Sequence, residues 1–287
     1  MFGLSSVRPV RVTRDSASGA VGNQFLLWTR RAPVGLCRLW QEVESRGVYG
    51  SAIDFAVESD HRCSMSFDSF QPWLGRLHQT GVVAVVIIDE PAKSERLVEA
   101  LLAGGIDLLE LTLRTPSALE SMRRIRHAFP GMGLGAGTIL RPDQVAEVQD
   151  AGADFGVAPG LNPRVVAAAA TAGFPFAPGV FSPSEIEQAV ELGCGVLKFF
   201  PAATDGQSRN FQTMIAPYAH LGLHYLPLGG LTLNLAEAFL GIPSVLALGG
   251  SWIAPRELIR TGDWATIEAN ARAISKLVQS MREKEQA

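Results

Sequence analysis

One lysine of this 287-residue chain lies in an apolar stretch, where a charged side chain is out of place. The chain has four lysines; Lys93, Lys276 and Lys284 have polar neighbours, whereas Lys198 lies in the segment VLKFFP. Burial disfavours the ammonium form and lowers the pKa of a lysine. A neutral amine can attack a ketone and form a Schiff base. The sequence therefore predicts a nucleophilic role for Lys198, and the alternative is a structural ion pair or a lysine whose ammonium reaches solvent.

Three polar side chains alternate with leucines shortly after residue 107. Glu110, Thr112 and Arg114 are spaced two apart, which places them on one face of a strand. A glutamate near a lysine can act as a general acid and base, and apolar surroundings would raise its pKa. An arginine at a strand end can bind a carboxylate through two parallel hydrogen bonds. The alternative is a buried Glu–Arg ion pair with a structural role alone.

Two glycine-rich turns follow the last two segments that we predict as strands. They contain the pair Gly229 and Gly230 and the sequence from Gly249 through Gly250 to Ser251. Backbone N–H groups left open by glycines near a helix start are a common phosphate site in barrel enzymes. Glycine pairs also simply end strands, but their position after these two strands favours phosphate binding.

Other catalytic chemistries find little support in the sequence. The five histidines show no paired spacing of metal ligands, so we expect no metal site. Cys194 has no neighbouring cysteine or histidine and is expected to be a small buried residue. No G-x-S-x-G motif is present.

Composition excludes several protein classes. Hydrophobic residues make up 47% of the chain, which argues against disorder, and three cysteines are too few for a disulfide scaffold. No apolar run reaches the roughly 18–20 residues of a membrane span. A net charge of −3 and a pI of 6.0 argue against nucleic-acid binding. We therefore expect a protein without membrane or nucleic-acid partners.

The elements that would position these residues repeat as a strand followed by a helix. Eight such units predict an α/β protein of the (β/α)8 TIM-barrel class, whose active site lies at the carboxyl ends of the strands. A doubly wound open sheet is the alternative, but no G-x-G-x-x-G motif follows the first strand. We read the glycine-rich stretch 133–137 as a narrow strand. The predicted strands are 82–88, 108–113, 134–137, 155–158, 174–177, 195–199, 223–226 and 244–248.

Residues 1–64 differ in composition from the rest of the chain. They contain eight arginines and no lysine, and Asp15 is the only acidic residue before Glu42. We predict that they form a disordered or dispensable extension, or reflect a start assigned too far upstream. The barrel, with a short N-terminal helix, would then occupy residues 65–287. An organelle transit peptide is the alternative.

Five motifs occur in order along the chain: GIDLLELTLR at 105–114, GAGT at 135–138, APG at 158–160, LKFFPA at 197–202 and GGSW at 249–252. Together they resemble the 2-keto-3-deoxy-6-phosphogluconate (KDPG) aldolase family, which includes the 4-hydroxy-2-oxoglutarate (KHG) aldolases. The resemblance covers about residues 75–280. It implies a cytoplasmic, homotrimeric class I aldolase on a (β/α)8 barrel, without metal or cofactor. The implied reaction is cleavage of KDPG to pyruvate and glyceraldehyde 3-phosphate in the Entner–Doudoroff pathway, with KHG as a further substrate.

The resemblance also implies a role for each matching residue. Lys198 corresponds to the Schiff-base lysine and Glu110 to the general acid–base. Further residues correspond to groups that hold the pyruvyl carboxylate (Arg114, Thr138), line the site (Pro159, Phe200) and bind phosphate (Gly229, Gly230, Gly250, Ser251).

One position departs from the family pattern. Leu228 stands before the first glycine pair, where the family often has threonine or serine. The missing hydroxyl leaves the preference between KDPG and KHG open, while the LRT stretch at 113–115 favours the gluconate over the galactonate substrate. Two alternatives keep the fold: a phosphate-binding barrel isomerase or synthase, which leaves Lys198 unexplained, and a non-catalytic trimeric barrel, which would be expected to lack Lys198 or Glu110.

Overall fold

The computed structural model describes residues 65–203 and 208–286, so the extension predicted for residues 1–64 lies outside the described residues. The first described element is helix α3 (Met65–Thr80). Arg76 and Thr80 of this helix both donate hydrogen bonds of 2.9 Å to the carboxylate of Asp107, just before the second strand. These bonds hold α3 against the amino-terminal side of the strands.

All strand pairs in the described part of the chain are parallel, which confirms the predicted α/β class. One sheet has the order β5-β4-β3-β2-β1-β9 and the other the order β6-β7-β8. The strands are β1 (Val82–Val86), β2 (Leu108–Thr112), β3 (Gly133–Gly137), β4 (Phe155–Val157), β5 (Phe176–Ala177), β6 (Gly179–Val180), β7 (Val196–Phe199), β8 (His224–Pro227) and β9 (Leu248–Gly250).

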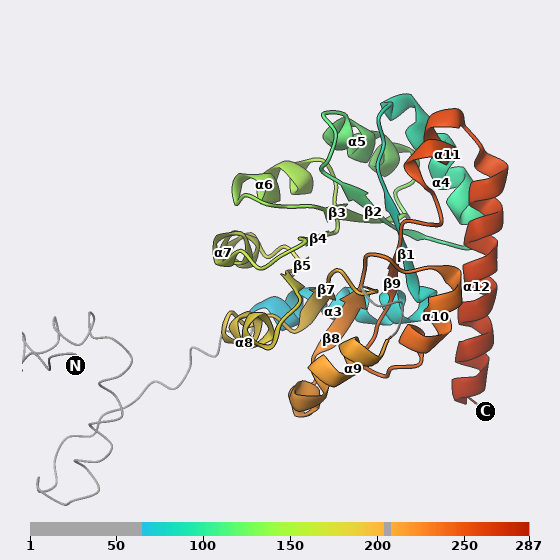
Figure 1. The fold of residues 1–287 in the computed structure, drawn as a ribbon. Coiled ribbons are helices and arrows are strands. Elements are labelled where there is room, and N and C mark those ends of the chain that lie inside the picture. Colours follow the sequence, from blue (N-terminus) through green and yellow to red (C-terminus); the bar gives the residue numbers. More distant parts are fainter. Residues whose placement is uncertain (1–64, 204–207, 287) are drawn as a thin grey trace, which may run out of the picture. The chain divides into compact units, whose positions relative to one another are not determined.

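Helices connect the strands and lie on the outer side of the curled sheets (Figure 1). Two of them begin with a polar cap followed by proline: Asn162 caps α7 and Ser182 caps α8, each accepting a backbone hydrogen bond. The helices are α4 (Ser94–Ala103), α5 (Ala118–Ala128), α6 (Asp143–Asp150), α7 (Pro163–Thr171), α8 (Pro183–Glu191), α9 (Arg209–Ile215), α10 (Leu233–Leu240), α11 (Arg256–Thr261) and α12 (Trp264–Gln286), with 3-10 turns η1 (Pro91–Lys93) and η2 (Ala216–Leu221).

Six of the predicted strands agree with the observed ones to within two residues at each end, and the other two differ more. The strand predicted at 174–177 is displaced and divided into β5 and β6 by Pro178, which has no N–H to donate to a ladder. The strand predicted at 244–248 is β9, which begins only at Leu248. Val245, Leu246 and Ala247 are buried, but a single bridge from Val245 to Tyr225 is their only strand pairing among the described residues. The apolar character of this stretch correctly predicted that these residues are buried, but it did not predict their hydrogen-bonding pattern.

The apolar side chains form two groups on opposite sides of the strands. The larger group lies between strands and helices, and includes Leu109 and Leu111 of β2. The smaller group lies inside the curve of the sheets and includes Leu108 of β2, together with Val157 and Leu226 of other strands. Alternate residues of β2 therefore face opposite sides, as the period of two predicts.

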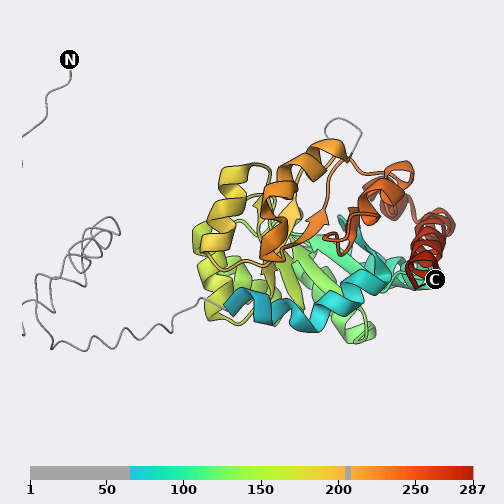
Figure 2. The same ribbon diagram turned by 90° about the horizontal axis from the view of Figure 1, so that it is seen from below.

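Helix α3 covers the inner group at one end. Phe70 and Leu77 are 1% and 0% exposed, and both belong to the inner group. The rings of Phe70 and Trp73 lie 6.3 Å and 5.7 Å from the ring of Phe155 on β4. Figure 2, which views the molecule from below, shows α3 lying across the strands at this end.

Strand β3 carries glycine at each of its inward positions. A Cβ added to Gly133 would lie 2.3 Å from Leu108, and one added to Gly135 would lie 2.4 Å from Phe155. The neighbouring side chains thus occupy the space that β3 leaves empty. This confirms the narrow strand predicted at 133–137.

Candidate active site

Lys198 and Glu110 meet inside the curve of the sheets. The Nζ atom of Lys198 on β7 donates to Oε1 of Glu110 on β2 at 3.1 Å, and lies 3.5 Å from Oε2. Their side chains are 6% and 3% exposed. The predicted proximity of this lysine and this glutamate is confirmed.

Strand pairing on both sides fixes the direction of the Lys198 side chain. The backbone N–H of Lys198 donates to the carbonyl of Pro178 at 2.9 Å, and Lys198 pairs with Leu226 across β8. Leu226 belongs to the inner apolar group, so Lys198 faces the same side. Its ammonium lies 5.5 Å from the ring centre of Phe200, two residues farther along the chain. An aromatic face at this distance attracts a cation.

The other two residues of the β2 pattern have different surroundings. Thr112 is buried, and its hydroxyl donates to the carbonyl of Val86 at 3.2 Å. Arg114 lies two residues past the end of β2 and is exposed, and its guanidinium has no hydrogen-bond partner among the described residues. Glu110 therefore forms the charged contact inside, while Arg114 is available to a ligand at the carboxyl end of β2.

Thr138 and Pro159 lie just after the next two strands, β3 and β4. Thr138 comes one residue after β3 and has φ of +63°, a left-handed conformation that is rare for a β-branched residue. Pro159 comes two residues after β4 and is half-buried. Because the carboxyl ends of parallel strands lie at one edge, both residues border the same end as Arg114.

The two glycine turns are brought together by β8 and β9. Leu228 and Gly249 form a parallel bridge, so the turns that follow them are neighbours. Gly229 and Gly230 have φ of +90° and +73°, which only glycine adopts readily. A Cβ on Gly229 would lie 2.8 Å from the Phe200 ring, which places this turn beside the segment that carries Lys198.

Leu228 occupies the interior beside these turns. It is 5% exposed, and a Cβ on Gly249 would lie 2.1 Å from its Cγ atom. The leucine thus fills the space next to the glycine turns with an apolar side chain.

Gly137 is part of the site, although its role was not predicted from the sequence. A Cβ added to Gly137 would lie 2.0 Å from Oε1 of Glu110, the same atom that accepts from Lys198. The signal in the sequence is the spacing of two between Gly133, Gly135 and Gly137, which places three glycines on one face of a strand.

Ion pairs and burial shift the pKa of several groups outside the site. Arg256 donates two hydrogen bonds, of 2.8 Å and 2.6 Å, to Asp89 near the end of β1, and this partner lowers the pKa of Asp89. Burial lowers the pKa of His224, at the start of β8, with a smaller effect from His78. Burial also raises the pKa of Tyr225 to about 12.

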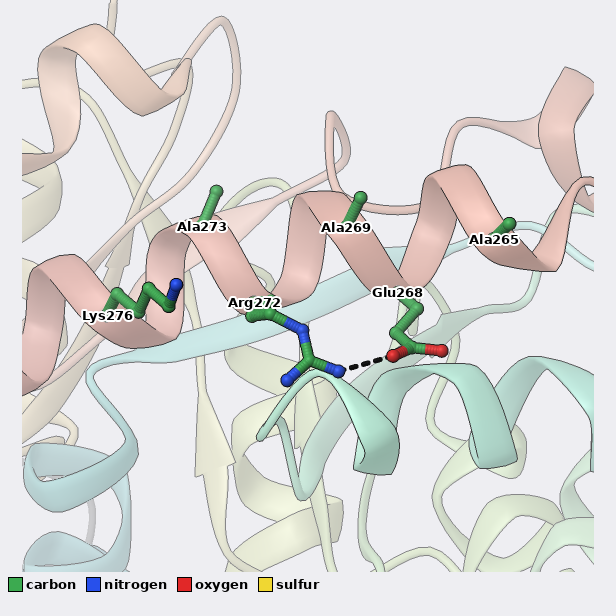
Figure 3. A pocket seen from close by; sticks show the side chains of 6 residues that line it. All are labelled: Ala265, Glu268, Ala269, Arg272, Ala273 and Lys276. Carbon is green, nitrogen blue, oxygen red and sulfur yellow. Dashed lines mark hydrogen bonds and ion pairs between the residues drawn. The ribbon is translucent and has the colours of Figure 1, made fainter.

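A hollow of about 520 Å³ runs along α12, away from these residues (Figure 3). Its lining consists of Ala265, Glu268, Ala269, Arg272, Ala273 and Lys276. Glu268 and Arg272 form an ion pair with each other, and Arg272 also donates to the carbonyl of Ala103 at 3.0 Å. The lining has no nucleophile paired with a base, so this hollow offers no comparable chemistry.

The described residues contain neither a cluster of metal ligands nor a membrane-spanning helix. No group of three or more histidine, cysteine, aspartate or glutamate side chains is placed to hold a metal ion there. None of the helices in this part of the chain has the length and apolar character needed to cross a bilayer.

Comparison with known proteins gives a consistent result. The sequence model of the KDPG and KHG aldolase family matches residues 75–270. A 2-dehydro-3-deoxy-phosphogluconate aldolase of Treponema pallidum is 38% identical over 205 residues, which cover 71% of this chain and 97% of that protein. A KHG/KDPG aldolase of Escherichia coli is 36% identical over 67% of this chain and 89% of that protein.

Solved structures show the same relationship. The KDPG aldolase of Legionella pneumophila, captured with pyruvate as a covalent carbinolamine, is 34% identical with a TM-score of 0.66, over 70% of this chain and 97% of that one. The enzyme of Zymomonas mobilis with 3-phosphoglycerate is 34% identical with a TM-score of 0.64, over 70% and 93%. A designed cage made by fusing symmetric oligomeric domains matches at 25% identity and a TM-score of 0.58, over 72% and 77%.

Proposed function

This chain belongs to the KDPG and KHG aldolase family, and from that premise we propose that it is a class I aldolase that cleaves KDPG to pyruvate and glyceraldehyde 3-phosphate. The observation that carries the proposal is the buried contact of 3.1 Å between Lys198 and Glu110. It supplies a nucleophilic amine and a proton-transfer group within reach of one reacting carbon.

The reaction begins at the amine of Lys198. The carboxylate of Glu110 takes the ammonium proton, and Nζ attacks C2 of the keto acid, forming an N–C bond and moving the carbonyl electrons to oxygen. Transfer of a proton from this nitrogen to that oxygen gives a carbinolamine. Glu110 then returns the proton that it took, the hydroxyl leaves as water, and a protonated imine remains. Glu110 is within hydrogen-bond distance of Nζ and is therefore placed to exchange these protons.

The imine then accepts the electrons of the bond that breaks. Glu110 removes the proton of the C4 hydroxyl, the C3–C4 bond breaks, and the aldehyde leaves while the electron pair forms an enamine. Glu110 returns a proton to C3, and water hydrolyses the resulting imine to release pyruvate and free Lys198. One carboxylate therefore serves as the base when the C3–C4 bond breaks and as the acid when the enamine is protonated.

The remaining predicted residues are assigned to substrate binding. Arg114 is exposed at the end of β2 and has no partner among the described residues, so its guanidinium can hold the pyruvyl carboxylate together with the hydroxyl of Thr138. Phe200 and Pro159 form the walls. The glycine turns, with Gly229, Gly230, Gly250 and Ser251, bind the phosphate through backbone N–H groups. The same site would accept KHG, which lacks the phosphate.

We infer that the two sheets close into a (β/α)8 barrel. Strands β5 and β6 form one stretch whose first half pairs with β4 and whose second half pairs with β7. The bridges Tyr225–Val245 and Leu228–Gly249 join β8 to the strand that pairs with β1. A ring of eight strands accounts for both sets of contacts.

The homotrimer is also a proposal, supported by the family and by exposed apolar side chains. Leu140 and Phe181, in the loops after β3 and β6, are 51% and 42% exposed. Side chains of this size are often covered by a partner. Light scattering coupled to gel filtration measures the mass. The cytoplasmic location and the division at residue 64 remain predictions from the sequence.

Trapping with borohydride tests the activity. The protein is incubated with pyruvate and sodium borohydride, and the modified peptide is mapped by mass spectrometry. We expect a reduced pyruvyl group on Lys198 and no adduct on the Lys198→Arg variant, which keeps the charge. Folded protein without an adduct would rule out the Schiff base and favour a phosphate-binding isomerase or synthase instead.

A further inference from the structure

The side chain of Glu110 extends toward Gly137 of β3 and not toward Gly135, the residue with which Glu110 is paired. In the strand register Glu110 pairs with Gly135, while Gly137 pairs with Thr112. The space beside Gly135 is filled by the ring of Phe155. The space beside Gly137, one step nearer the carboxyl ends of the strands, is filled by the Glu110 carboxylate.

The fit between Gly137 and Glu110 is close. A Cβ on Gly137 would lie 2.0 Å from Oε1, 2.7 Å from Cδ and 2.8 Å from Cγ of Glu110. Three successive atoms of the glutamate thus lie within the space of one methyl group. Gly137 does not have a left-handed φ, so its backbone would accept alanine, and the constraint is contact alone.

We propose that Gly137 is a positioning residue, whose missing side chain forms the slot that holds the Glu110 carboxylate against Lys198. The inference rests on the proposed function, since it assigns a determinant of the Glu110 position in that reaction. A methyl group in the slot would displace Oε1 from the 3.1 Å contact with Nζ. The proton transfers that need Glu110 would then slow, while Lys198 and the groups that bind substrate stay in place.

The central experiment measures Gly137→Ala in the full-length chain. We expect kcat for KDPG cleavage to fall about 100-fold, which is typical when a catalytic group is misplaced by about 1 Å. KM should change by less than about threefold. Exchange of the pyruvate methyl protons with D2O, followed by NMR, should slow by a similar factor. Borohydride should still trap pyruvate on Lys198 at equilibrium, because the amine is unchanged.

Two glycines of the same region supply matched controls. Gly135→Ala adds a methyl group to the same face of β3 but against Phe155, so it should lower the melting temperature while kcat of the folded protein stays within about threefold. At Gly131, just before β3, an added Cβ meets no atom within 4 Å, so Gly131→Ala should change neither stability nor rate.

A double-mutant cycle tests whether Gly137 acts through Glu110. In the Glu110→Ala background the slot is empty, so adding Gly137→Ala should change the residual rate by less than about threefold and should cost far less stability than Gly137→Ala costs in the wild type. The double variant also provides a test if Gly137→Ala alone does not fold. The double variant should then be as stable as Glu110→Ala alone, and a double variant that fails to fold where Glu110→Ala folds would show that the methyl group meets something else.

The outcomes separate the two proposals. A wild-type protein that forms no adduct and cleaves no KDPG would refute the proposed function, and the stability cycle would still test the slot. An active wild type with Gly137→Ala at full kcat would overturn the positioning role alone. An equal rate loss in Gly135→Ala and Gly137→Ala would also overturn it, because that loss would reflect general strain in β3.

Discussion

The Nζ atom of Lys198 lies 3.1 Å from Oε1 of Glu110, although 88 residues separate the two in sequence and they belong to different sheets. Both side chains are almost completely buried, so each is the counter-charge of the other. Breaking such a pair by removing one partner typically costs about 3–5 kcal/mol of stability. Variants of either residue therefore change stability together with chemistry, and rates must be measured on protein shown to be folded.

Replacing Lys198 should abolish turnover. Lys198→Ala removes the only amine at the site among the described residues, so no Schiff base can form, and cleavage of KDPG should fall below detection. A coupled assay for the aldehyde product measures the rate. Lys276→Ala, on the exposed side of α12, is the control and should keep full activity. Turnover in folded Lys198→Ala would contradict the mechanism.

Replacing Glu110 by its amide should slow proton transfer while leaving the amine intact. We expect Glu110→Gln to lower kcat by about 10²- to 10⁴-fold, with a much smaller change in KM. Steady-state kinetics give both constants, and borohydride trapping shows whether Lys198 still reacts. A kcat close to the wild-type value would exclude Glu110 from proton transfer.

Replacing Leu228 tests the substrate preference. Leu228→Thr places a hydroxyl beside the glycine turns, and a hydrogen bond to a charged phosphate, worth about 1.5–3 kcal/mol, should raise the ratio of kcat/KM for KDPG over KHG by about tenfold or more. The smaller side chain should also lower stability, because it leaves space beside Gly249.

Leu226→Thr is the matched control for Leu228→Thr. It changes an inward residue of β8, which lies two positions before Leu228 and so farther from the glycine turns. It should lower stability without changing the substrate ratio. The same change of ratio in both variants would show that Leu228 has no special relation to the phosphate.

Removing the hydroxyl of Tyr225 should stabilise the protein. The Oη atom is buried without a hydrogen-bond partner among the described residues, and burial raises the pKa of Tyr225 to about 12. A buried hydroxyl without a partner costs about 1–3 kcal/mol, so Tyr225→Phe should raise the melting temperature by a few degrees. Differential scanning calorimetry measures this. A lower melting temperature would show that the hydroxyl makes a favourable contact.

Stability should depend on pH through His224. Burial lowers the pKa of His224 below its ordinary value of 6.5, so as the pH falls below 6.5 the unfolded chain binds a proton before the folded protein does. The contribution is therefore complete above 6.5 and is lost as the pH falls toward the folded-state pKa. When the pH is lowered from about 7.5 to about 5.5, the melting temperature of His224→Gln should therefore fall less than that of the wild type. His220→Gln, at an exposed site, should behave as the wild type.

Much of the fold and the two central site residues could be predicted from the sequence. Lys198 could be predicted because a charge within an apolar strand needs a partner. Glu110 could be predicted because polar side chains spaced two apart mark one face of its strand. The strand boundaries near Pro178 and Val245 were less predictable, because an apolar run signals burial and not hydrogen bonding. The missing N–H of proline becomes informative only when the neighbouring strands are known.

The role of Gly137 could not be obtained from local sequence. Glycine spacing in β3 signals a narrow strand, but which side chain fills each gap depends on the register with β2 and β4. The same holds for Leu228, whose position beside Gly249 results from a bridge between segments far apart in the chain. Contacts of this kind arise from tertiary packing.

Helix α3 covers the interior at the amino-terminal ends of the strands, so among the described residues the approach to Lys198 lies at the opposite end. The described residues thus leave the interior open at one end, and the product fragment nearer that end must leave before the deeper one. In the proposed reaction the glycine turns at that end would hold the phosphate half of the substrate, while the pyruvyl half would be bonded to Lys198 deeper inside. The aldehyde fragment would then leave first, and water would follow it inward to release pyruvate last.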